Sequence, residues 1–121
     1  MKDSDKQRLE HMRAYCIDIS KTIARFGDEF EIFISDFDYF NSVSMSILQI
    51  GELANSLSDE YKNQTKAQMP WGMIRNTRNI LAHTYHRADK EIIWETARSD
   101  IPTVCNFCEE QLMTAEETDN E

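Results

Sequence analysis

Residues 75–85 contain two arginines, two asparagines, a histidine and a tyrosine around the aliphatic run Ile80-Leu81-Ala82. Arginine can stabilise the charge of a phosphate through two parallel N–H donors, and histidine can accept or donate a proton near pH 7. Together these side chains suit cleavage of a phosphodiester bond by proton transfer, without a metal ion. Because the same residue types are common on solvated helix faces, their presence alone leaves a purely structural role open.

The spacing Arg78-Asn79-x-x-x-His83-x-Tyr85 resembles the signature of the HEPN domain, and specifically that of the HepT-like toxins of toxin–antitoxin pairs. The Arg-to-His spacing alone occurs by chance in many helices, but three further segments resemble the same family in the same order. These are QIGELAN at 49–55, WGMIR at 71–75, and IW at 93–94 with DIP at 100–102. The resemblance extends over roughly residues 9–112.

The resemblance implies a compact helical dimer that cleaves RNA without a metal ion or cofactor, with Arg78 and His83 as the catalytic pair. His83 would move the proton of a ribose 2′-hydroxyl or of the leaving oxygen, and Arg78 would hold the phosphate as charge develops. The expected product is a 2′,3′-cyclic phosphate, and Arg75 and Asn79 would bind phosphate or RNA. The family's usual antitoxin is a minimal nucleotidyltransferase, which transfers AMP to the tyrosine that Tyr85 matches.

Two other functions remain open on the sequence. HEPN domains also include nucleotide- or RNA-binding modules without demonstrated cleavage, in which Arg78, Asn79 and Tyr85 would grip a phosphate and His83 would be structural. The acidity of the rest of the chain favours this alternative, since it weakens affinity for RNA. In the third interpretation the chain is a structural helical partner with a basic face, and the complete signature is a coincidence.

The net charge of −9 argues at first against a nucleic-acid partner. However, residues 1–60 carry 6 basic and 12 acidic side chains, residues 61–90 carry 6 and 1, and residues 91–121 carry 1 and 9. The central segment, with its net charge of +5, contains the signature, as expected for a small phosphate-binding site on an acidic protein. The same segregation of charge would also suit docking to an oppositely charged partner.

The length of 121 residues suits one domain, and its 3 Gly and 2 Pro favour helices over a turn-rich β-structure. We expect a cytoplasmic protein with no membrane partner, because the chain has no long apolar run and no secretory signal. An odd number of cysteines then predicts reduced thiols. Cys105-x-x-Cys108 lacks a second pair that would complete a zinc site, and we interpret both residues as ordinary helix-face cysteines.

Two long stretches place apolar residues at alternating spacings of three and four, which predicts two antiparallel helices of a bundle. A short helical turn over residues 28–35 connects them, and Gly27 ends the first. The first stripe consists of Leu9, Met12, Cys16, Ile19, Ile23 and Phe26, and the second of Phe40, Val43, Ile47, Ile50, Ala54 and Leu57.

Two residues in the second helix bear on the site. Gly51 costs roughly 1 kcal/mol relative to alanine inside a helix, and a glycine there often allows another helix to approach closely. Glu52 is the only acidic residue between Asp38 and Asp59. It is either a solvated side chain or the partner of an arginine, and the sequence does not decide between these.

The polar stretch 58–69 predicts a frayed helix end and a loop, after which Pro70 starts a third helix. Arg78 and Tyr85 share one face of that helix, whereas His83 is rotated from Arg78 by about 140°. Either the helix ends before His83, or a second subunit completes the pair, and the latter favours a homodimer with one shared cleft. His86 is predicted to be a solvated turn residue.

A further helical segment from about residue 89 should break or kink at Asp100-Ile101-Pro102 and be followed by a last helix to about residue 112. We therefore predict an all-α fold, a four- to five-helix antiparallel up-and-down bundle of the HEPN type, over residues 1–113. Residues 114–121 are acidic and polar, which predicts a disordered tail.

Overall fold

The structure, a computed structural model, describes residues 1–81 and 87–119. The described part of the chain is helical apart from short connections, which confirms the all-α prediction. Its elements are α1 (Asp3–Phe26), α2 (Phe30–Ser35), α3 (Phe37–Ser56), α4 (Asp59–Thr65), α5 (Trp71–Leu81), α6 (Arg87–Glu95), the π-helical turn η1 (Thr96–Asp100) and α7 (Ile101–Asp119).

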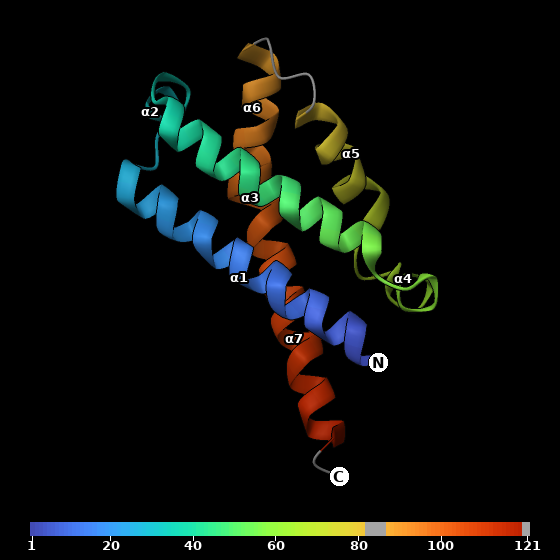
Figure 1. Cartoon of the computed structure of the whole chain (residues 1–121). Helices are drawn as coiled ribbons and strands as arrows, with labels where there is room; N and C mark the ends of the chain where they lie inside the picture. Colours follow the sequence, from blue (N-terminus) through green and yellow to red (C-terminus); the bar gives the residue numbers. More distant parts are fainter. Residues whose placement is uncertain (82–86, 120–121) are drawn as a thin grey trace.

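Helices α1 and α3 run side by side in opposite directions, as their matching stripes predict (Figure 1). On the other side of α3 lies α5, while α7 crosses behind α1. Helix α6, η1 and α7 follow one another as a single long rod. None of the helices in the described residues is long and apolar enough to cross a bilayer.

The predicted stripes form the core between α1, α3 and α7. Helix α1 ends where predicted, at Gly27, whose φ of 119° favours glycine and whose N–H donates to the carbonyl of Ile23. The buried residues of the three helices include Leu9, Met12, Cys16 and Ile19 from α1, Val43, Ile47, Ile50 and Ala54 from α3, and Ile101, Val104, Cys108 and Leu112 from α7.

An aromatic cluster closes the core at the α2 end, where the sequence places a short helical turn. The ring centroid of Phe33 lies 5.2 Å from that of Tyr39 and 5.0 Å from that of Trp94. The Tyr39 hydroxyl donates a hydrogen bond of 3.0 Å to the carbonyl of Gly27. This bond satisfies the polar end of a buried aromatic side chain and joins the start of α3 to the end of α1.

The stretch 58–69 is not only a loop as predicted, because residues 59–65 form α4. Ser58 caps this helix by accepting a hydrogen bond of 3.2 Å from the N–H of Tyr61. Tyr61 and Thr65 are buried, and Thr65 accepts a bond of 3.0 Å from the indole N–H of Trp71. Two buried positions in seven residues are too few to give a detectable period, which explains why the prediction was wrong here.

Where the sequence predicts a break or a kink, at residues 100–102, the structure has the π-helical turn η1 just before Ile101. The N–H of Ile101 donates to the carbonyl of Thr96, five residues earlier. Pro102 has no N–H, and its ring would clash with the carbonyl four residues before it. A widened turn relieves this clash, so the helix continues from α6 into α7 without a break.

Helix α7 also continues through residues 114–119, which the sequence analysis assigns to a disordered tail. This part of the prediction is wrong up to Asp119. Alanine and glutamate are good helix formers, and neither Gly nor Pro interrupts the segment. A charged composition therefore does not distinguish a solvated helix extension from coil.

Asp5 joins the start of α1 to the start of α4. Only 1% of Asp5 is exposed, and its carboxylate accepts hydrogen bonds of 2.8 Å from the N–H and 2.6 Å from the hydroxyl of Ser58. Burial by itself raises the pKa of Asp5, but the two bonds from Ser58, with Arg8 nearby, outweigh it and lower the pKa. The native state therefore favours the ionised carboxylate.

We expect Asp5→Asn to lower the free energy of unfolding at pH 7 by about 1–3 kcal/mol, since bonds to a charged acceptor are lost. The folded pKa of Asp5 is lower than its unfolded value, so its contribution is present above about pH 4 and is lost as the pH falls further. Urea unfolding at pH 7 and pH 3 measures this, with Asp3→Asn, an exposed acid in the same turn, as the control. An equal difference between wild type and Asp5→Asn at both pH values would contradict it.

Candidate active site on α3 and α5

Gly51 allows α5 to lie close to α3, as the sequence predicts. A Cβ atom at residue 51 would lie 3.4 Å from the Cβ of Arg78 and 3.7 Å from the carbonyl oxygen of Ile74. The backbone of α3 thus faces the stem of Arg78 directly. This contact fixes where the Arg78 side chain leaves α5.

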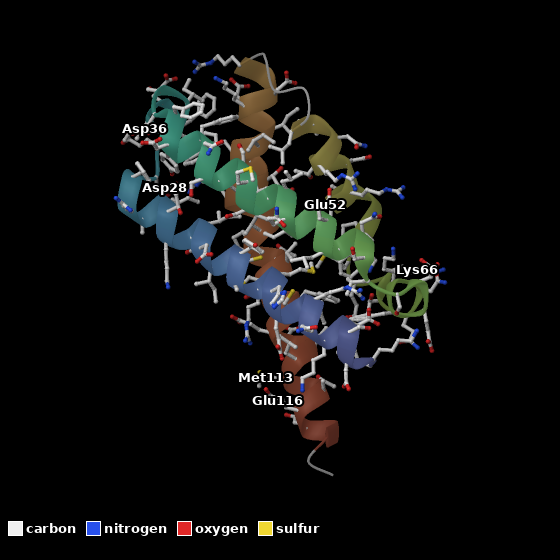
Figure 2. The ribbon with its side chains drawn as sticks, in the orientation of Figure 1. Asp28, Asp36, Glu52, Lys66, Met113 and Glu116 are labelled. Carbon is white, nitrogen blue, oxygen red and sulfur yellow. The ribbon has the colours of Figure 1, made fainter. Side chains whose placement is uncertain are left out.

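The guanidinium of Arg78 pairs with Glu52, whose side chain projects from α3 beside α5 (Figure 2). The Nε of Arg78 lies 3.0 Å from the Oε1 of Glu52, and the two side chains are 37% and 48% exposed. Of the alternatives for Glu52, the structure supports an arginine partner within the same chain. The pair engages Nε, whereas bidentate phosphate binding can use the two Nη groups at the end of the planar guanidinium. Glu52 therefore orients the arginine without occupying that end.

The other predicted site residues divide into two groups. Arg75 and Asn79 are exposed on α5, and Arg75 lies one helical turn before Arg78. The structure therefore brings three of the five predicted side chains to the solvent side of one helix. His83 and Tyr85, like His86, lie outside the described residues, so the catalytic pair and the AMP acceptor stay predictions.

Arg87, the first residue of α6, contacts two side chains of α2. It forms ion pairs with Glu31 and, at 3.5 Å, with Glu91, and its guanidinium lies 4.9 Å from the ring centroid of Phe30. The hydrogen bond to Glu31 is the main reason why the pKa of Arg87 is raised. Its positive charge is thus partly balanced by acids of α2 and α6.

The cysteines behave as the ordinary helix-face residues that the sequence predicts. All three thiols are free, and those of Cys16 and Cys108 are buried. Burial is the main cause that raises the pKa of Cys108 to about 12, and it also raises the pKa of Cys105. Thiolate formation is disfavoured at both positions, so neither is suited to be a nucleophile.

A shallow pocket lies beside the ion pair, at the α4 end of the α3–α5 contact. It has a volume of about 170 Å³. The sequence does not indicate this pocket, because residues 58–69 are predicted to be a frayed helix end and a loop, although the basic residue at 62 belongs to the positive segment. The lining residues are Ala54, Asn55, Lys62, Trp71, Gly72 and Arg75.

A helical bundle with a paired arginine on the helix that leads into the R-x4-H sequence agrees with the resemblance to HEPN-type ribonucleases. The chain belongs to the ribonuclease HepT-like family, whose model matches residues 10–111. It is 31% identical over 94 residues to a "Putative RNase" of Caldanaerobacter subterraneus subsp. tengcongensis, which covers 78% of this chain and 81% of the relative.

Two archaeal relatives extend over more of the chain. A "Probable ribonuclease HepT" of Thermococcus cleftensis is 30% identical over 106 residues, which is 86% of this chain and 92% of the relative. A "Putative RNase" of Methanocaldococcus jannaschii is 29% identical over 113 residues, which is 89% of this chain and 93% of the relative. No solved structure gives a significant match.

Proposed function

We propose that this protein is the toxin of a toxin–antitoxin pair and acts as a metal-independent endoribonuclease. The observation that carries the proposal is the Arg78 guanidinium, held 3.0 Å from Glu52 on the solvent side of α5, in a chain of a ribonuclease family. A positioned guanidinium that is paired through its Nε and is 37% exposed suits an RNA phosphate.

In the proposed reaction the ribose 2′-oxygen attacks the adjacent phosphorus, and the bond from phosphorus to the 5′-oxygen breaks. A 2′,3′-cyclic phosphate and a 5′-hydroxyl result. One proton leaves the 2′-hydroxyl and one is delivered to the 5′-oxygen, and His83 serves one of these transfers. Arg78 stabilises the additional negative charge on the phosphate oxygens, with Arg75 and Asn79 binding the RNA beside it.

We further propose that the active form is a homodimer whose two signatures face one shared cleft. The charge distribution supports this, because two copies of residues 61–90, each with a net charge of +5, would create a strongly positive region on an otherwise acidic protein. Sedimentation at micromolar concentration should show a dimer. The cognate partner is a minimal nucleotidyltransferase antitoxin.

The function is tested with the purified, unmodified protein and RNA in excess EDTA. We expect cleavage with cyclic-phosphate ends, and no cleavage of DNA of the same sequence, because DNA lacks the 2′-hydroxyl. Intact RNA at protein concentrations that match the RNA would overturn the enzyme proposal. Bound but uncut RNA would instead support the alternative, a HEPN module that binds nucleotides or RNA without cleaving them.

We expect Glu52→Gln to lower kcat for RNA cleavage by about 10–100-fold, because a misoriented Arg78 no longer matches the reacting phosphate. KM should stay the same or fall, since the substitution removes a negative charge beside the phosphate. The melting temperature should barely change, because an exposed ion pair contributes little stability. Steady-state kinetics separate these effects, and Glu60→Gln, an exposed acid on α4, is the control. An unchanged kcat would contradict the orienting role.

A further inference from the structure

The pocket at the α4 end of the α3–α5 contact brings two cations from different helices to one place. Lys62 projects from α4 and Arg75 from α5, and both line its wall. Lys62 is anchored, because its Nζ donates a hydrogen bond of 3.3 Å to the carbonyl of Asn55. The ring of Trp71 is also anchored, by its indole N–H and by an edge-to-face contact of 5.5 Å with Phe107.

The charges around this pocket favour an anion. Asp59 lies 3.7 Å from Lys62, but its side chain is 98% exposed, and a pair of this kind is weak. Among the described residues, Arg75 forms no ion pair. The pocket thus combines a fixed apolar wall, one partly balanced cation and one unbalanced cation.

The pocket lies next to the ion pair between Arg78 and Glu52, along the same two helices, α3 and α5. Asn55 follows Glu52 by three residues on α3, and Arg75 precedes Arg78 by three residues on α5. Residues three apart are surface neighbours on a helix, so the pocket and the ion pair lie about one turn apart along the contact between α3 and α5. Arg75 and Arg78 can therefore contact consecutive phosphates of a single strand.

We propose that this pocket is a second phosphate subsite, which binds the backbone of single-stranded RNA next to the scissile bond. Lys62 and Arg75 bind the flanking phosphate, and Trp71 supports the adjoining sugar or base. The inference rests on the proposed ribonuclease function, because it adds one more nucleotide of the RNA substrate, on the α4 side, to those that the proposed active site contacts. It assigns a role to Lys62 and Trp71, which the catalytic signature does not include.

Gly72 offers a test that leaves the fold intact. Gly72 lines the pocket, and a Cβ atom at this position would meet no other atom within 4 Å, so a side chain there fits without disturbing the core. Gly72→Glu places a negative charge in the subsite, and it also suits the first turn of α5, where acids are favourable. Gly72→Gln has nearly the same size without the charge and is the matched control.

Binding is measured with a fluorescent 2′-O-methyl RNA hexanucleotide, which has no free 2′-hydroxyl and cannot be cut by this reaction. We expect Gly72→Glu to bind about tenfold more weakly than Gly72→Gln at low salt. The slope of log K against log salt is negative, and Lys62→Ala should make it shallower by about 0.7, the value for one phosphate contact of a single strand. Lys66→Ala removes an exposed cation that does not line the pocket, and it should change the slope less.

The outcomes separate this inference from the function on which it rests. If the wild-type protein cleaves RNA but Gly72→Glu and Gly72→Gln bind the hexanucleotide with equal affinity, the subsite proposal is wrong and the ribonuclease proposal stands. Equal slopes for Lys62→Ala and Lys66→Ala also overturn the subsite proposal, since they would indicate general attraction rather than a site. If the wild type binds the hexanucleotide with the expected Gly72 and Lys62 effects but cleaves no RNA, the subsite holds and the ribonuclease proposal fails.

Discussion

Replacing Arg78 with alanine is expected to lower kcat/KM for RNA cleavage by about 10²–10³-fold, because this removes the donor that stabilises the charged transition state. His83→Ala should lower it by about 10²–10⁴-fold through loss of proton transfer. The two variants should differ in binding. Arg78→Ala should weaken affinity for uncleavable RNA, whereas His83→Ala should leave it close to that of the wild type.

Arg78→Lys distinguishes geometry from charge at this position. Lysine keeps the charge but lacks the planar fork that can contact Glu52 and a phosphate together, so we expect little recovery of kcat over Arg78→Ala. Asn76→Ala, an exposed substitution on the same helix, is the control for nonspecific effects on α5. Wild-type cleavage by either Arg78→Ala or His83→Ala would show that the signature does not carry the reaction.

Co-expression with the cognate nucleotidyltransferase is expected to abolish cleavage by adding AMP to Tyr85. A phosphate attached at that position would bring a negative charge and the bulk of a nucleotide to the Arg78 face of the signature. RNA phosphate would then compete with a tethered anion, which has a high effective concentration. Mass spectrometry should find one or more added AMP groups on the peptide that contains Tyr85.

Tyr85→Phe provides the decisive variant, because it keeps the ring and removes the nucleophile. The variant should retain cleavage, gain no AMP and escape neutralisation by an active transferase. Full neutralisation of Tyr85→Phe would exclude modification of this tyrosine as the mechanism. An inactive transferase paired with the wild-type protein shows how much inhibition arises from binding alone.

The repeated apolar spacings predicted α1 and α3 correctly because burial against a neighbouring helix requires that period. Gly27 as a helix end was predictable because its positive φ favours a residue without a side chain. Gly51 lies where α5 packs against α3, as expected, although a Cβ atom there would make contacts of ordinary length. The contact between Gly51 and Arg78 then places the ion pair. Whether Glu52 is solvated or paired depends on the distance between two helices, which periodicity does not give.

The errors arose where local rules compete with packing. Residues 59–65 form a helix whose buried Tyr61 and Thr65 are hydrogen-bonded to Gln111 of α7 and Trp71 of α5. So short a segment shows no period of its own. Pro102 predicts a break or a kink, and in the structure the helix continues from α6 to α7 through the π-helical turn η1. For the site, the resemblance named Arg78 and His83. The charge count places Lys62 in the positive segment, but no sequence pattern indicates that α4 brings it beside Arg75.

The π-helical turn η1 also fixes how far α7 is rotated about the helix axis relative to α6. Ile93 before it and Val104 after it are both buried in the core, on the faces of α6 and α7 that are turned away from solvent. One residue corresponds to about 100° of rotation around a helix axis, so deleting any residue between 96 and 100 would turn one of these two faces toward solvent. The first residues of α6, where the chain returns from the signature, would turn with it. Selection on η1 should therefore act on its length more strongly than on the identity of its residues.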